Sequence, residues 1–479
     1  MSTPLLKRAY SDELFKQEGN ELIQLLSDHL SSHIGEKTDK VIEWSTPNDE
    51  YEFWEQFAKE KHSTKNLFET ILNRSIATHN PKYIGHQISP TVPVSGLATL
   101  LSAMLNNGMA VYEMGAAATA IEKLVVNEFT KAIGYNDNAD GFLTSGGTLA
   151  NLTALIAARK SVAKDDVWND GHTNKLAVLV SEEAHYCIDR AARIMGLGDG
   201  GIIKVPVNEN FKINTSQLET AYNNAKNNGY EVIAVVGSAP STSSGVHDDL
   251  EALAEFAQQK NIWFHVDGAH GGAAVFSSKY KYLLNGIEQA DSVAIDGHKM
   301  MATSSITTAL LFKRSNDTYT TFSQKAHYLW DKNDDLEWYN LAKRTFECTK
   351  SMMSIRFFSI INAYGTQFFD DYVTTLYDLG KTFADIIESN EEFELAMQPE
   401  TNILCFRVKG DLDSEEIGNI NQQIRRQLLE DGEFYIVSTY LKGVFYLRVT
   451  IMNVFTNESH FKALLNKIIS IKNNSSINV

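Results

Sequence analysis

The stretch Ser292-Val293-Ala294-Ile295-Asp296-Gly297-His298-Lys299 decides the fold, because a short apolar run here ends in a polar segment that carries a lysine. An apolar run of this length between polar residues is typical of a parallel strand covered on both faces. Open α/β sheets bind their ligands at the carboxyl ends of such strands. Partial burial at that end can lower the pKa of Lys299 and make its amine a nucleophile towards a carbonyl group. A solvated lysine at a strand end is the competing interpretation of this segment alone.

A second apolar strand, predicted at 262–266, ends in the carboxylate of Asp267. The residues that follow, Gly268-Ala269-His270-Gly271-Gly272, are mostly small, so they permit a flat aromatic ring to approach the backbone closely. Asp267 could then bind a polar atom of such a ring. Alternatively, it could cap the turn that follows the strand.

A glycine-rich segment, Leu143-Thr144-Ser145-Gly146-Gly147-Thr148-Leu149-Ala150-Asn151, opens an apolar-periodic stretch that predicts a helix. Backbone N–H groups, the helix dipole and side-chain hydroxyls would converge at this helix start, an arrangement typical of a phosphate site. The segment has neither the Walker pattern nor the GxGxxG pattern, so it does not imply a nucleotide. An ordinary glycine turn is the alternative.

His185 follows a third predicted strand, 176–180, at another strand-to-helix junction. Its ring could stack on a planar ligand, or it could begin the helix and satisfy its own hydrogen bonds there. Together the four segments supply a phosphate site, a stacking imidazole, a carboxylate and an amine. Pyridoxal 5′-phosphate requires all four, because the carboxylate keeps the pyridine nitrogen protonated and the lysine binds the aldehyde.

These segments resemble the pyridoxal-phosphate-dependent group II amino-acid decarboxylases, the family of glutamate, aromatic amino-acid, histidine and diaminobutyrate decarboxylases. The resemblance runs from about Pro81 to about Phe461 and is carried by TSGGTLANLTALIAAR, SEEAHYCIDRAA, FHVDGAHGG and SVAIDGHKMM. It implies the α/β fold of the PLP-dependent transferases (fold type I), with a mostly parallel seven-stranded sheet. It also implies an obligate homodimer whose subunits share their active sites.

The resemblance further implies roles for individual residues. Lys299 would be the Schiff-base lysine, Asp267 would pair with the pyridine nitrogen, and His185 would stack on the ring. The remaining implied cofactor contacts are Ala269 on the other face of the ring, and Gly147, Thr148, His298 and a hydroxyl of the 238–243 loop, which we assign to Thr242, at the phosphate. The loop reads Ser-Ala-Pro-Ser-Thr where the family usually has Gly-Thr-Thr, so its hydroxyl partner is open.

Tyr328 bears on the type of reaction. It lies in a polar segment that reads as a mobile loop, and a tyrosine at this position in the resembling family closes over the neighbouring subunit's site and takes part in protonation at Cα. With Lys299 and His185 it completes the predicted catalytic set. It favours decarboxylation over the oxidative, aldehyde-forming variants and over a non-catalytic protein. A surface tyrosine in a loop is the alternative.

The sequence predicts the type of reaction more narrowly than it predicts the substrate. Gln87 falls where the glutamate branch of the family has a substrate-contacting glutamine. Arg448, on a strand predicted at 444–450, is placed by the resemblance near a substrate carboxylate, which a guanidinium binds bidentately. An exposed strand arginine is the alternative. We expect a polar acyclic amino acid of the glutamate, aspartate or diaminobutyrate type, with an aromatic amino acid or another PLP-dependent lyase reaction as the alternative.

Composition narrows the class of partner. The chain has 479 residues, with 43 Lys and Arg against 60 Asp and Glu, so its net charge of −17 argues against nucleic acid and anionic membranes. Three widely spaced cysteines argue against a disulfide framework or a metal site, and no apolar run suits a signal peptide or a membrane span. We therefore expect a cytoplasmic enzyme with a small-molecule substrate and no metal.

Strands predicted at about 176–180, 202–207, 231–237, 262–266, 292–296 and 307–312 alternate with helical patterns, which specifies a doubly wound sheet. We expect three parts: an N-terminal helical dimerisation segment at 1–85, a large cofactor-binding α/β domain at 86–356 and a small α+β domain at 357–479.

Overall fold

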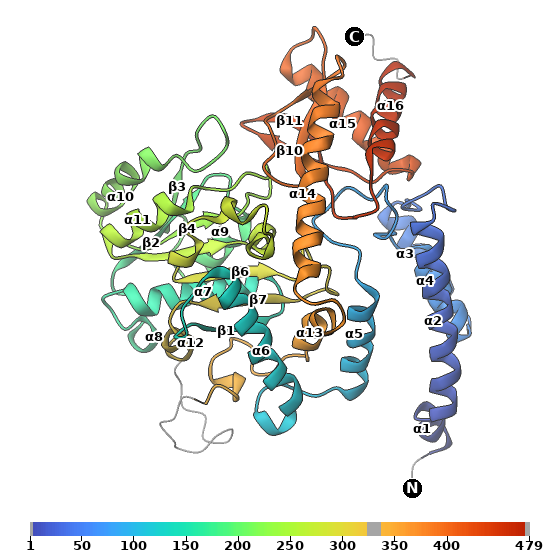
Figure 1. The fold of residues 1–479 in the computed structure, drawn as a ribbon, viewed down its shortest axis with the longest axis horizontal. Helices are drawn as coiled ribbons and strands as arrows, with labels where there is room; N and C mark the ends of the chain where they lie inside the picture. The colour runs from blue at the N-terminus through green and yellow to red at the C-terminus, as the bar shows by residue number, and fades with distance from the viewer. Residues whose placement is uncertain (1–2, 323–336, 475–479) are drawn as a thin grey trace. The chain divides into compact units, whose positions relative to one another are not determined.

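The computed structural model describes residues 3–322 and 337–474 of the chain (Figure 1). The chain divides into two compact units. The larger unit contains Gln87–Lys381 and Met397–Leu404, and the smaller contains Met1–His86, Thr382–Ala396 and Cys405–Val479. The three-part division expected from the sequence stays a prediction.

A seven-stranded sheet organises the larger unit, in the strand order β1-β7-β6-β5-β4-β2-β3. The neighbouring strands β6, β5, β4, β2 and β3 all pair in parallel, whereas β7 is antiparallel to both β6 and β1. This confirms the predicted mostly parallel sheet and its six predicted strands; β1 was not predicted. The strands are β1 (Asp140–Thr144), β2 (Lys175–Ser181), β3 (Ile202–Val205), β4 (Tyr230–Ser238), β5 (Trp263–Asp267), β6 (Ser292–Asp296) and β7 (Thr308–Phe312).

Helices cover both faces of this sheet, since its strands are apolar on both sides (Figure 1). Helices α7 (Gly147–Val162) and α9 (Tyr186–Ile194) pack with alternate strand residues such as Val178, Ala234 and Trp263 in one buried cluster. Helix α11 (Leu250–Lys260) covers β4 and β5 from the other side, where Leu250 and Leu253 lie against Gly237. The remaining helices that lie within the larger unit are α5 (Pro93–Leu105), α6 (Ala116–Ile133), α8 (Val167–Asp170), α10 (Leu218–Asn227), α12 (Ser315–Thr320) and α13 (Ser354–Tyr364).

Charged side chains occupy the outer edge of strand β1. Glu122 Oε1 accepts a hydrogen bond from Leu143 N at 3.0 Å, and Lys350 Nζ lies 2.5 Å from both Leu143 O and Glu122 Oε1. Arg344 binds the carbonyl of Gly141 in the same way. An edge strand normally presents free N–H and C=O groups to solvent or to another chain. These side chains therefore satisfy the edge and fix the strand that leads into the glycine-rich segment.

The smaller unit begins with four helices: α1 (Pro4–Ala9), α2 (Asp12–Ile34), α3 (Pro47–Phe57) and α4 (Thr64–Asn73). Each follows a Ser or Thr whose side chain accepts a hydrogen bond from the first turn, which is why the helices begin there: Thr3, Ser11, Thr46 and Ser63.

A second, four-stranded sheet has the order β10-β11-β9-β8. Its strands are β8 (Phe393–Leu395), β9 (Ile403–Val408), β10 (Val437–Leu441) and β11 (Val444–Thr450), and the accompanying helices are α14 (Gln367–Glu388), α15 (Ser414–Asp431) and α16 (Glu458–Asn474). Among the helices of residues 3–322 and 337–474, none combines the length and apolar character needed to cross a bilayer.

Candidate active site

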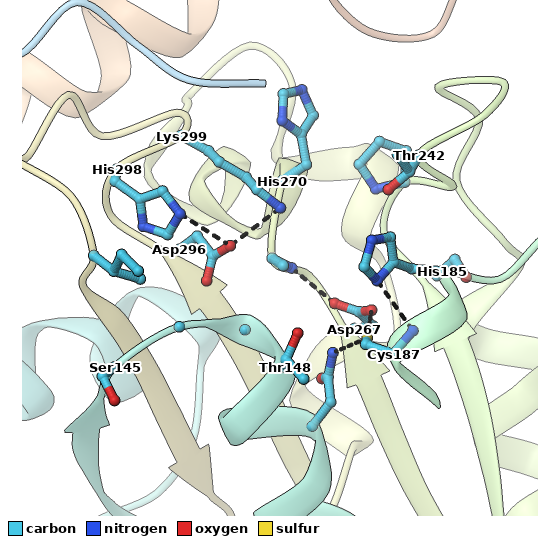
Figure 2. A pocket seen from close by; sticks show the side chains of 17 residues that line it. Ser145, Thr148, His185, Cys187, Thr242, Asp267, His270, Asp296, His298 and Lys299 are labelled. Atoms are coloured by element: carbon cyan, nitrogen blue, oxygen red, sulfur yellow. Dashed lines mark hydrogen bonds and ion pairs between the residues drawn. The ribbon is translucent and has the colours of Figure 1, made fainter. Parts of the chain in front are cut away.

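A cavity of about 290 Å³ opens at the carboxyl ends of the parallel strands in the larger unit (Figure 2). Segments that directly follow β1, β2, β4, β5 and β6 line it. Its volume is near the lower end of the range for small-molecule sites. The topology thus brings together the four segments that the sequence analysis singled out, although they are up to about 150 residues apart in the chain.

The first wall of the cavity is the start of helix α7. Gly146 has a φ of 110°, a conformation that favours glycine, and no side chain of the described residues caps the helix. A Cβ atom on Gly147 would lie 3.2 and 3.3 Å from the two carboxylate oxygens of Asp296, tighter than normal contact. Gly147 and Thr148 line the cavity, and the first N–H groups of a helix have no intrahelical acceptor. This wall can bind an anion.

The second wall is the end of β5, where Asp267 is 8% exposed. Its Oδ1 accepts a hydrogen bond from Ala269 N at 3.2 Å, and the thiol of Cys187 lies 3.9 Å from its Oδ2. Figure 2 shows the carboxylate at the cavity, with Cys187 beside it. Each carboxylate oxygen has two lone pairs, so the group can still accept a hydrogen bond from a ligand N–H.

Lys299 lies across the cavity from Asp267, and its Nζ is 3.1 Å from Asp296 Oδ2 (Figure 2). Burial lowers the pKa of Lys299, but Asp296 and then Asp267 outweigh burial, and the net effect raises the pKa. The lowered pKa expected from the sequence is therefore wrong for the protein without ligands. Two carboxylates, which the sequence analysis did not weigh, favour the charged ammonium form.

Two imidazoles complete the polar lining. Burial lowers the pKa of both His185 and His298, so both rings favour the neutral form. His185 Nδ1 accepts a hydrogen bond from Cys187 N at 3.3 Å and caps helix α9, while the ring borders the cavity. His185 thus caps a helix and also lies where its ring can stack on a ligand. His298 Nε2 lies 3.7 Å from Asp296 Oδ2.

The other predicted residues fall into three groups. Ala269 and Thr242 line the cavity, whereas the hydroxyls of Ser241 and Ser243 bind Glu183. Gln87 is buried outside the cavity lining and its Nε2 has no partner among the described residues; Arg448 is buried on β11 in the other compact unit. Tyr328 lies outside the described residues.

Several residues that line the cavity had no role predicted from the sequence, above all Asp296, Asn151 and Cys187. Asp296 ends strand β6 as Asp267 ends β5, so a carboxylate at the strand end was a usable signal. Asn151 lies one helical turn after Gly147, and Cys187 lies two residues after His185. Their positions depend on how α7 and α9 pack against β5, which local patterns do not reveal.

The walls of the cavity match three chemical groups: an anion, a cationic N–H and a carbonyl. The start of α7 suits a phosphate, Asp267 suits a protonated ring nitrogen, and Lys299 suits an aldehyde. Pyridoxal 5′-phosphate carries all three, so the residues present fit this cofactor. Within the described residues, no group of His, Cys, Asp or Glu is arranged to hold a metal ion.

Comparisons with known proteins agree with this chemistry. The model of the pyridoxal-dependent decarboxylase conserved domain matches residues 47–409. An L-2,4-diaminobutyrate decarboxylase of Acinetobacter baumannii is 27% identical, covering 86% of this chain and 83% of that protein. An L-aspartate decarboxylase of Metarhizium robertsii is 30% identical, covering 70% of this chain and 67% of that protein. The crystal structure of mouse CSAD, 22% identical, has a TM-score of 0.88 over 96% of this chain and 99% of that one, which shows the fold.

Proposed function

The chain belongs to the pyridoxal-dependent decarboxylase family and decarboxylates an amino acid with pyridoxal 5′-phosphate as its cofactor, and on this premise we propose that the substrate is a polar, acyclic L-amino acid. The products would be a primary amine and carbon dioxide. Relatives named for diaminobutyrate and aspartate support this substrate class. The second candidate is an aromatic amino acid, and an oxidative decarboxylation or another lyase reaction on the same scaffold is the third.

One observation carries the cofactor chemistry on which the proposal rests: Lys299 Nζ, the Asp267 carboxylate and the start of α7 face a single cavity. When bound, pyridoxal phosphate supplies a ring that accepts the electron pair released as a bond at the substrate's Cα breaks. Lys299 would bind the cofactor covalently and Asp267 would bind its ring nitrogen. The other residues proposed to hold it are His185 and Ala269 at the ring, and Gly147, Thr148, His298 and Thr242 at the phosphate.

Lys299 needs a base before it can act as a nucleophile, because its pKa is raised. Asp296 Oδ2, at 3.1 Å from Nζ, stabilises the ammonium form and so opposes the loss of that proton. Asp296 also binds the hydroxyl of Thr308 on the antiparallel strand β7, so its carboxylate is held in place. We therefore add Asp296 to the proposed site residues, as the group that holds the Lys299 ammonium in position before the cofactor binds.

Tyr328 is the proposed acid that delivers a proton to Cα after carbon dioxide leaves. A phenol is a suitable acid because it donates one proton and then carries the charge on oxygen. In the presence of dioxygen as the oxidant, the Tyr328→Phe variant should form aldehyde, ammonia and hydrogen peroxide in place of part of the amine. Unchanged amine yield, measured by chromatography of the products, would exclude this role.

Two residues are proposed to bind the substrate. The side-chain amide of Gln87 is buried with an Nε2 that has no partner among the described residues, so it has an unused donor. Gln87 also lies two residues before Ser89, whose N and Oγ both donate to the carbonyl of His298. This tether supports a position beside the cavity. Arg448 would bind a substrate carboxylate through its guanidinium group.

A homodimer is proposed as the working form. Helix α5 exposes a row of apolar side chains, with Leu97, Leu101 and Met104 each more than half exposed. A contiguous apolar row of this kind on a folded unit marks a protein interface. A second copy of the chain is the occupant that the family suggests. The cytoplasmic location expected from the sequence stays a prediction.

The test is release of carbon dioxide from purified protein with added pyridoxal phosphate. The panel should contain glutamate, aspartate, diaminobutyrate, ornithine, lysine, histidine and the aromatic amino acids. We expect turnover of one acyclic polar substrate, abolished in Lys299→Ala and kept in Lys65→Ala, a lysine on the exposed surface. Turnover restricted to aromatic amino acids would contradict the substrate proposal and leave the reaction standing.

A further inference from the structure

A series of buried hydrogen bonds ends on the carboxylate of Asp267. The Cys187 thiol lies 3.9 Å from Asp267 Oδ2, and Asn151 Nδ2 donates to Cys187 Sγ at 3.2 Å. On its other side, Asn151 Oδ1 lies 2.8 Å from His265 Nε2. Asp267 and His265 belong to β5, Asn151 to α7 and Cys187 to α9. Three elements of the fold are thus joined directly beneath one carboxylate.

The series continues away from the cavity into the core. His265 Nδ1 lies 2.9 Å from Ser292 Oγ and 3.2 Å from the backbone carbonyl oxygen of Ser292, and Trp263 Nε1 donates to the same hydroxyl at 2.8 Å. The five residues behind Asp267 are each at most 1% exposed, so bulk water does not reach their hydrogen-bonding groups: Trp263, Ser292, His265, Asn151 and Cys187. Each group must find its partner inside the protein.

The donors in this series all point towards Asp267. A carboxylate only accepts, so the thiol of Cys187 donates to Oδ2, and Sγ in turn accepts from the Asn151 amide. The carbonyl end of that amide then faces His265 Nε2, which must carry the proton. Burial lowers the pKa of His265 to about 4, so the ring is neutral and its Nδ1 accepts from Ser292.

The far end of the series agrees with this direction, which follows from the 2.8 Å contact of Asn151 Oδ1 with His265 Nε2 rather than from the longer 3.2 Å contact of Nδ1 with the Ser292 carbonyl. The indole N–H of Trp263 is a donor only, so the hydroxyl of Ser292 accepts from Trp263 and has its own proton left for His265 Nδ1. A reversed series would leave the sulfur lone pairs of Cys187 facing the Asp267 carboxylate. The arrangement therefore presents one fixed donor to Asp267 Oδ2, in addition to the backbone donor at Oδ1.

We propose that Cys187, Asn151 and His265 are positioning residues, which hold a hydrogen-bond donor against Asp267 and thereby keep its carboxylate ionised and oriented towards the cavity. The inference rests on the proposed role of Asp267 as the partner of the cofactor's ring nitrogen. A donor to a carboxylate favours the charged form. An ionised Asp267 in turn keeps the bound ring nitrogen protonated, which is the state that makes the ring a strong electron acceptor.

The first experiment uses the protein without cofactor and reads the S–H stretching band of Cys187 by infrared spectroscopy. The band is assigned as the one lost in Cys187→Ser. His265→Phe removes the N–H that fixes the Asn151 amide, so the band should move towards that of a weaker hydrogen bond. His265→Gln keeps an N–H donor and should retain the band. A band that stays in place in His265→Phe overturns the proposed direction.

The second experiment uses the protein loaded with pyridoxal phosphate labelled with ¹⁵N at the ring. Cys187→Ala should lower the pH at which the ring nitrogen loses its proton and raise the dissociation constant of the cofactor about three- to tenfold, as for the loss of one buried hydrogen bond. Cys187→Ser restores a donor and should restore both values. Cys405→Ala, which removes a buried thiol in the other unit, is the matched control.

The two proposals fail in different ways. If Asp267→Asn leaves the ring-nitrogen signal and its titration unchanged, Asp267 does not bind the ring nitrogen and the proposed function of that residue fails. If Asp267→Asn alters the signal while Cys187→Ala and His265→Phe leave it unchanged, the role of Asp267 stands and the positioning residues are excluded. Rescue by Cys187→Ser separates loss of the donor from general disturbance of packing.

Discussion

The ion pair at the outer edge of strand β1 supports a quantitative prediction. In Lys350→Met, the Glu122 carboxylate would lose its cation and Leu143 O would lose its donor. The side chains of Lys350 and Glu122 are 2% and 3% exposed, so neither loss is offset by water. Removing one partner of a buried ion pair costs about 3–5 kcal/mol. We expect a loss of this size in the free energy of unfolding of the larger unit.

The double variant Glu122→Gln/Lys350→Met should be more stable than the single one. Gln keeps an oxygen to accept the hydrogen bond from Leu143 N and removes the isolated charge. The costs that remain are the unpaired carbonyl of Leu143 and the amide N–H of the introduced Gln, which lies where Glu122 Oε2 has no partner among the described residues; both are neutral groups, which cost less than an isolated buried charge. The charge, not the lost side-chain volume, would then account for most of the damage in the single variant.

Hydrogen exchange measured by mass spectrometry on a peptide covering 140–144 is the direct assay, together with urea unfolding. Lys123→Met is the matched control, because Lys123 is one-third exposed and its partner Asp140 keeps Arg344. We expect the control to cost less than about 1 kcal/mol. The reasoning is refuted if Lys350→Met costs no more than this control, or if the double variant is as unstable as the single one.

Three further predictions concern charged and titrating groups. Asp296→Asn removes the largest influence that raises the pKa of Lys299, so the rate of cofactor attachment, followed by absorbance, should reach its plateau at lower pH than in the wild type. His247 is buried, both its ring nitrogens lack partners among the described residues, and burial lowers its pKa to about 4. The neutral His247 ring therefore contributes its full share of stability above pH ~6.5, and this share is lost as the pH falls towards 4. In urea unfolding, His247→Phe should reduce the loss of unfolding free energy over this pH range by up to about 3 kcal/mol. An unchanged pH dependence of the unfolding free energy would exclude this role of His247. Burial raises the pKa of Cys187 to about 12, so alkylation at pH 8, mapped by mass spectrometry, should modify the exposed Cys348 and spare Cys187; equal labelling would contradict this.

Local sequence patterns sufficed for the strands of the parallel sheet, because each is a short apolar run between polar residues. Strand β1 was not predicted because its last two residues, Leu143 and Thr144, were taken as the approach to the glycine turn. Its neighbour β7 begins at Thr308, 164 residues after β1 ends at Thr144. Strand pairing at such distances leaves no trace in local composition.

The features of the candidate site also divide into those that local sequence predicts and those that only the folded structure determines. Residues such as Lys299 and Asp267 could be singled out because each ends a recognisable strand. The direction of the shift in the Lys299 pKa could not be predicted from the sequence, since it depends on the distance to Asp296 after folding. The hydrogen-bond series through Asn151 and Cys187 depends in the same way on how two helices pack on β5.

The antiparallel strand β7 also sets an order of events during synthesis. Among the strands of the described residues, β1 has β7 as its single neighbour, so it can join the sheet only after residues up to Phe312 have been made. The ribosome releases the chain from its N-terminus, and units form as their residues emerge. The parallel strands β2 to β6 can therefore assemble while the segment after β1 still lacks its support. A nascent chain that ends before β7 would hold Lys299 without a fixed phosphate site, and cofactor capture would begin only once β7 has paired.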